Sequence, residues 1–68
     1  MVDRVEFRIF PDDNQWKMNR DNEFVAVFSS RELAIEAAEG YRSEIAQNGG
    51  VTSIIVLKPD GSEHSIQP

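Results

Sequence analysis

Few residues of this chain have the chemistry of a catalytic or metal-binding group. His64 is the only histidine and there is no cysteine, so an imidazole pair, a thiolate nucleophile and a sulfur-ligated metal are all absent. Asp12, Asp13 and Asn14 place three oxygen ligands in a row, but they lack the glycine and the distal glutamate of a calcium-binding loop. A solvated turn is the favoured interpretation of this segment. We therefore expect no enzymatic activity, no metal and no cofactor.

Three basic residues offer a different kind of chemistry. Arg8, Lys17 and Arg20 lie in the first two predicted strands and could project from the outer face of a sheet. Sheets can contact the grooves of DNA with such side chains. Glu6 and Glu23 interrupt the basic patch, and the net charge of −5 argues against a phosphate backbone as the default partner. Nucleic-acid binding by a β-sheet module is therefore the alternative function, and nucleic acid is not the expected partner.

The size and composition of the chain favour one small domain over residues 1–68. A chain of 68 residues buries only about 60% of the surface that its unfolded form exposes. The sequence has no apolar run long enough for a signal peptide or a membrane span. We therefore expect an acidic, cytoplasmic protein without a membrane partner.

The elements that must position these residues begin with five predicted strands. Alternation of apolar and polar residues is typical of half-buried strands, and the fourth run is apolar enough for an interior strand. The strands cover residues 5–9, 15–20, 23–28, 51–57 and 62–66. Residues with turn chemistry, such as proline, aspartate, asparagine and glycine, separate them at 11–14, 21–22 and 58–61.

One helix lies between the third and fourth strands. Ser29 stands three residues before Glu32, which is the spacing of a capping box, so the helix is predicted from Ser30 to Gln47. Asn48-Gly49 supplies the left-handed residue that ends it. One arc of the helix is predicted to hold Leu33, Ala34, Ala37, Ala38, Tyr41 and Ile45, and its three alanines to let the helix sit close to the sheet. Of these, Leu33, Ala37, Tyr41 and Ile45 are predicted to pack on a sheet that bears Val5, Phe7 and Ile9.

The order of these elements predicts a two-layer α+β domain with the sequence β-β-β-α-β-β and a mostly antiparallel sheet. A right-handed crossover through the helix places the fourth strand beside the first. The spatial order of the strands is then 3-2-1-4-5.

A family resemblance accompanies this pattern. Its motifs are an aromatic strand, a capped helix start and a late Asp-Gly turn, represented here by Trp16-Lys17, Val27-Phe28-Ser29-Ser30, Glu32 to Ala38, and Asp60-Gly61. In these motifs the chain resembles DUF2188, a family of small bacterial and phage proteins without an assigned activity. The resemblance implies the same fold and no catalytic residue.

A single helix can cover only one face of the sheet. Alternation places Phe24, Ala26 and Phe28 on one side of the third strand, and Val25 and Val27 on the other. Apolar residues on both faces invite a second protein chain. We therefore predict a non-enzymatic interaction module that forms a homodimer or binds a partner protein through the sheet face opposite the helix. The predicted contacts are Val25, Val27 and, at the helix flank, Ile35.

Overall fold

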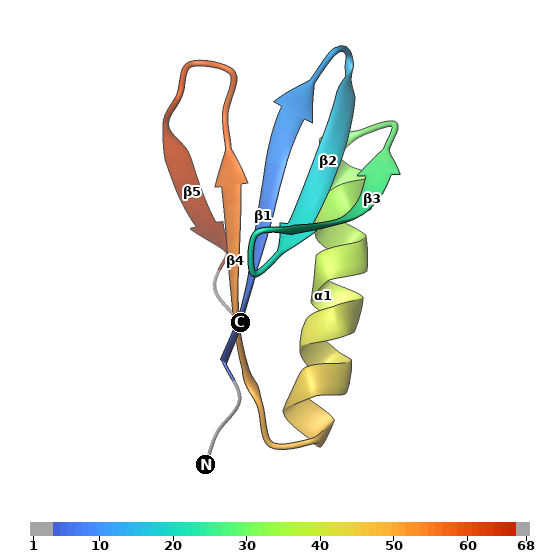
Figure 1. The fold of residues 1–68 in the computed structure, drawn as a ribbon, viewed down its shortest axis with the longest axis vertical. Helices are drawn as coiled ribbons and strands as arrows, with labels where there is room; N and C mark the ends of the chain where they lie inside the picture. The colour runs from blue at the N-terminus through green and yellow to red at the C-terminus, as the bar shows by residue number, and fades with distance from the viewer. Residues whose placement is uncertain (1–3, 67–68) are drawn as a thin grey trace.

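The computed structural model describes residues 4–66 of the chain. It contains β1 (Arg4–Asp12), β2 (Gln15–Arg20), β3 (Glu23–Phe28), α1 (Arg31–Gln47), β4 (Val51–Leu57) and β5 (Glu63–Ile66). The strands form one sheet in the order β3-β2-β1-β4-β5 (Figure 1), with β1 and β4 parallel and every other neighbouring pair antiparallel. The predicted α+β class and strand order are both confirmed.

The first two connections are tight hairpins. Asp13 and Asn14 have φ values of 52° and 65°, and Asp21 and Asn22 have φ values of 50° and 71°. Two successive residues with positive φ define a type I′ turn, which matches the twist of the strands that it joins. Asparagine and aspartate tolerate this conformation better than most residues.

Pro11 was predicted to belong to the first turn, but it lies inside β1, opposite Trp16. Asp12 and Gln15 flank the two-residue turn and form its hydrogen-bonded pair, so the neighbouring pair of Pro11 and Trp16 is a non-hydrogen-bonded one. The missing N–H of proline therefore costs no bond with β2. On the other side of β1, the pairing with β4 ends at Ile9.

The helix begins one residue later than predicted. Ser30, rather than Ser29, is the N-cap, and its Oγ accepts a hydrogen bond from the N–H of Leu33 at 3.2 Å. Phe28 still pairs with Trp16 in the sheet, so Ser29 is used to turn the chain from the strand into the helix. At the other end Gly49 has a φ of 83°, and the N–H groups of Gly49 and Gly50 donate to the carbonyls of Ala46 and Ile45. This is the Schellman arrangement.

The two serines make the position of the cap testable. Ser30→Ala is expected to lower the free energy of unfolding by about 0.5–2 kcal/mol, because it removes the acceptor for the Leu33 N–H. Ser29→Ala is the matched control and is expected to change it by less than about 0.5 kcal/mol. Urea titrations followed by circular dichroism measure both values. A larger loss for Ser29→Ala than for Ser30→Ala would contradict this assignment of the cap.

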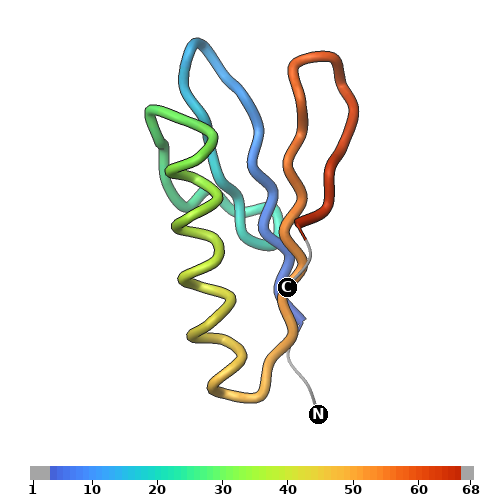
Figure 2. The backbone as a smooth tube through the Cα atoms, turned by 180° about the vertical axis from the view of Figure 1, so that it is seen from behind, coloured from blue at the N-terminus to red at the C-terminus, as the bar shows by residue number. Residues whose placement is uncertain are grey.

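The helix α1 lies along one face of the sheet (Figure 2), and the hydrophobic core lies between the two. Its buried members are Val5, Phe7, Ile9, Met18, Ala34, Ala38, Ile54 and Val56. The predicted inward placement of Val5, Phe7 and Ile9 is confirmed. Within residues 4–66, no helix covers the opposite face of the sheet.

The predicted inner side of the helix is partly wrong. Leu33 is 48% exposed, whereas Ala34 and Ala38 are fully buried. At 100° per residue the buried arc is centred on Ala38, and Leu33 falls on its far flank. The Tyr41 ring still stacks on Phe7 with a centroid distance of 5.4 Å. Small alanine side chains bring the helix backbone close to the large side chains of the sheet, and this close approach selects the alanine face over the leucine.

Candidate functional site

The sheet face turned away from α1 is called the open face. Phe7 and Ile9 are buried beneath the helix, so the even-numbered residues of β1 point the other way. The strand pairing extends this assignment to neighbouring strands, because Arg8 lies opposite Asn19 and Ile55. The open face consists of Arg4, Glu6, Arg8, Phe10, Asp12, Gln15, Lys17, Asn19, Phe24, Val27, Val51, Ser53, Ile55, Leu57, Glu63 and Ser65.

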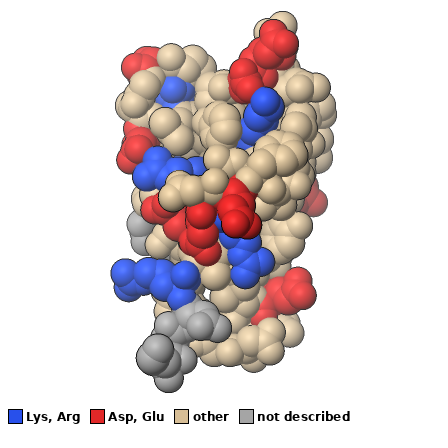
Figure 3. Space-filling model, viewed as in Figure 1, with Lys and Arg blue, Asp and Glu red and all other residues tan. Residues whose placement is uncertain are grey.

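Charged residues of the open face are joined in ion pairs. Arg8 Nε lies 3.2 Å from Glu6 Oε2, and Arg8 Nη1 lies 3.3 Å from Glu63 Oε2. The hydrogen bonds to Glu6 and then to Glu63 raise the pKa of the Arg8 guanidinium. Lys17 pairs with Asp12 on the same face. Positive and negative side chains are interspersed over the surface seen in Figure 3, with no continuous field of either sign.

The three predicted nucleic-acid contacts do not form one patch. Arg8 and Lys17 belong to the open face, where both are held by carboxylates. Arg20 lies opposite Phe7 on the helix side of the sheet, with its Cζ 6.0 Å from the centroid of the Phe7 ring. The alternating direction of side chains along a strand accounts for Lys17 and Arg20 lying on opposite faces.

The exposed apolar side chains of the open face are concentrated on β3. Phe24 is 62% exposed and Val27 is 41% exposed, and Val51, at the start of β4, is 48% exposed. Nearer the middle of the sheet, Phe10, Ile55 and Leu57 are only half-exposed among the ion pairs. The two exposed apolar side chains that share a strand thus lie at the β3 edge of the sheet, and Val51 lies apart from them on β4.

A β-bulge changes the predicted faces of β3. Asn19 pairs with Phe24, but Met18 pairs with Ala26, so Val25 has no partner in β2. The extra residue shifts the side-chain alternation by one position. Phe24 therefore joins Val27 on the open face, although strict alternation predicted it beside Ala26 and Phe28. The sequence contains no glycine that would indicate a bulge here.

Two of the three predicted interface residues lie elsewhere. Val25, at the bulge, is half-buried against the core, and Ile35 packs against the same core from the helix. Val27 is the one member of that set on the open face. Ile35 turns inward because it lies three residues before the buried Ala38, about 60° from it around the helix.

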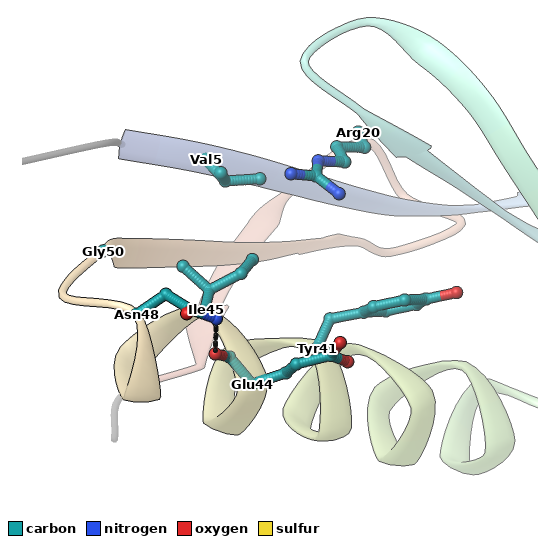
Figure 4. A pocket seen from close by; sticks show the side chains of 7 residues that line it. All are labelled: Val5, Arg20, Tyr41, Glu44, Ile45, Asn48 and Gly50. Carbon is teal, nitrogen blue, oxygen red and sulfur yellow. Dashed lines mark hydrogen bonds between the residues drawn. The ribbon is translucent and has the colours of Figure 1, made fainter.

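A cleft of about 310 Å³ opens between the C-terminal half of α1 and the sheet. Figure 4 shows Val5 and Arg20 on the strand side of this cleft and Tyr41, Glu44 and Ile45 on the helix side. The cleft brings together the guanidinium of Arg20, the carboxylate of Glu44 and the phenol of Tyr41 beside the apolar side chains of Val5 and Ile45. Among the described residues these groups include no nucleophile paired with a base. The cleft offers charge and hydrogen bonds rather than a reacting group.

The remaining candidate residues lie apart from one another. His64 is exposed on β5. Trp16, which alternates with Met18 along β2, packs against the core. Residues 4–66 hold no group of three or more histidine or acidic side chains placed to bind a metal ion. None of the described helices has the length and apolar character needed to cross a membrane.

No family model, curated protein or solved structure matches the chain. The resemblance to DUF2188 therefore stays an expectation from sequence motifs.

Proposed function

We propose that this protein is a non-enzymatic interaction module that self-associates through the apolar end of its open face. The observation that carries the proposal is the exposure of Phe24 and Val27 side by side on β3. Aromatic residues at such positions often supply a large share of binding energy. Transfer of these side chains from water to a protein surface is the expected driving force.

The charge distribution favours a second copy of the chain as the partner. The open face carries the bases Arg4, Arg8 and Lys17 and the acids Glu6, Asp12 and Glu63. These charges balance, although the whole chain has a net charge of −5. The helix, in contrast, carries four glutamates, Glu32, Glu36, Glu39 and Glu44, against two arginines, Arg31 and Arg42, so its net charge is −2. Two copies can therefore meet through their open faces without the repulsion that would oppose contact between their helices.

The small size of the apolar patch predicts a weak complex. A standard interface buries about 800 Å² on each partner, and the described residues expose 4666 Å² in total. An interface of standard size would thus use about a sixth of the surface. We expect a dissociation constant in the micromolar range.

Placing a charge on the patch tests the proposal. Val27→Lys is expected to weaken self-association by at least about tenfold, because a buried lysine without a partner is costly at an interface. Ala46→Lys, on an exposed part of α1, is the matched control and should leave the association unchanged. Sedimentation equilibrium measures both, and thermal unfolding confirms that each variant is folded. An unmodified protein that stays strictly monomeric at high micromolar concentration would refute the proposal.

A further inference from the structure

The two edges of the sheet differ in how well they resist the addition of another strand. Edge strands in natural proteins are protected by shortness, charge, proline or a bulge. The edge strand β5 has only four residues, and these include Glu63 and His64. The edge strand β3 has six residues, Glu23 to Phe28, and five of them are apolar. Of the usual protections, only the bulge at Val25 and the charge of Glu23 are present in β3.

The hairpin geometry determines which backbone groups of β3 face the free edge. Arg20 and Glu23 flank the type I′ turn, so they form a hydrogen-bonded pair. The next pair, Asn19 with Phe24, is then a non-hydrogen-bonded one. The N–H and C=O of Phe24 therefore point away from β2, toward the side of β3 that has no neighbouring strand in the described sheet.

The bulge moves the next outward-facing backbone groups along the strand. In a regular strand, the next N–H and C=O groups to face the free edge after those of Phe24 would belong to Ala26, two residues further on. Here Val25 is the extra residue and Ala26 pairs with Met18, so the next outward groups belong to Val27. The free edge of β3 thus presents N–H and C=O groups at Phe24 and Val27, which are three residues apart. Both side chains also lie on the open face.

We propose that the partner of β3 is the β3 strand of a second copy, added antiparallel across a two-fold axis. In this arrangement Phe24 of each copy lies opposite Val27 of the other, and each pair exchanges two backbone hydrogen bonds. The same symmetry places Val25 opposite Ala26. A regular strand presents its hydrogen-bonding groups at two-residue intervals and does not match the spacing set by the bulge, whereas a second copy carries the same insertion and does.

The side chains of this register are also complementary. Two cross-strand pairs of phenylalanine and valine form on the open face, and aromatic residues beside β-branched ones stabilise antiparallel sheets. Glu23 is the only charged residue of β3. In this register it lies opposite Phe28 of the second copy, so the two Glu23 carboxylates do not face each other. The interface is isologous, as two-fold symmetry requires. It rests on the proposed self-association and specifies how the two copies are arranged.

Amide hydrogen exchange tests the arrangement in the unmodified protein. The N–H groups of Phe24 and Val27 are expected to exchange at least about tenfold more slowly when the protein concentration is raised above the dissociation constant, because pairing protects them. The amides of the β5 edge serve as internal controls and should not change with concentration. Association without protection at Phe24 and Val27 would overturn the edge pairing.

A backbone substitution gives a second test. Chemical synthesis of the chain with an N-methyl group on the Phe24 amide keeps the side chain but removes the outward donor. This form is expected to associate at least about tenfold more weakly than the synthetic unmodified chain, with an unchanged unfolding temperature in dilute solution. If the N-methyl form associates normally while Val27→Lys does not, the edge pairing is wrong and the proposed function stands. A strict monomer would overturn both.

Discussion

Phe7→Ala is expected to lower the free energy of unfolding by about 3–5 kcal/mol, because the ring is fully buried and its removal leaves a cavity. The same ring stacks on Tyr41 and lies under the guanidinium of Arg20, so its loss also removes contacts to α1 and β2. A domain of this length has a total stability of about 3–10 kcal/mol. The variant is therefore expected to be partly or wholly unfolded at room temperature.

Leu33→Ala is the matched control for Phe7→Ala. Leu33 is an apolar residue of similar hydrophobic character, but it is 48% exposed, and its truncation should cost less than about 1 kcal/mol. Urea titrations of the two variants and the unmodified protein measure the contrast. Equal losses for both variants, or a loss below about 1 kcal/mol for Phe7→Ala, would show that the ring is not the centre of the core.

Ala38→Leu is expected to destabilise the protein by about 1–3 kcal/mol, because the added atoms must fit where the helix backbone is closest to the sheet. Ala38 has no exposed surface and lies in the core with Ala34. The larger side chain can be accommodated only if the helix moves outward, which also weakens the contact between Tyr41 and Phe7.

Ala46→Leu provides the comparison on the same helix. Ala46 is exposed, and leucine has nearly the helix propensity of alanine, so the free energy of unfolding should change by less than about 0.5 kcal/mol. Thermal and urea unfolding followed by circular dichroism compare the two variants. An Ala38→Leu protein as stable as the unmodified one would mean that the space beneath α1 is larger than the structure indicates.

The sheet was largely predictable from the sequence, because the alternation of apolar and polar residues along a strand indicates which of its faces is buried. Val5, Phe7 and Ile9 alternate with polar residues, and the turns at Asp13-Asn14 and Asp21-Asn22 use residues that tolerate positive φ. The handedness of the crossover then places β4 beside β1. These signals are local and agree with one another, and the strand order follows from them.

The orientation of the helix was harder to predict, because its apolar residues do not form one narrow stripe. Leu33 and Ile35 lie on opposite sides of the buried arc, and alanines occur between them. Size alone favours Leu33 as a core residue. The predicted arc holds both Leu33 and the alanines, but the large side chains of the sheet already fill the interior, so Ala34 and Ala38 are fully buried and Leu33 is not. This choice depends on packing between distant parts of the chain.

The candidate surface depended on a feature that the sequence does not signal. The bulge at Val25 reverses the direction of Phe24 relative to the rest of β3, and no glycine or proline indicates its position. Strict alternation therefore identified Val27 as a surface residue but missed Phe24. An unpaired residue in one strand of a hairpin becomes apparent only when the register of both strands is known.

The parallel pairing of β1 with β4 has a consequence for the kinetics of folding. The hairpins that join β1, β2 and β3 link neighbouring segments, and such hairpins form in about 1–10 μs. In contrast, β1 and β4 are separated in the sequence by two strands and α1, and closing so long a loop is slow. During synthesis, one edge of β1 therefore stays unpaired until the ribosome has released the β4 segment, Val51–Leu57. The parallel pair at the centre of the finished sheet is therefore expected to form later than the hairpins that join β1, β2 and β3.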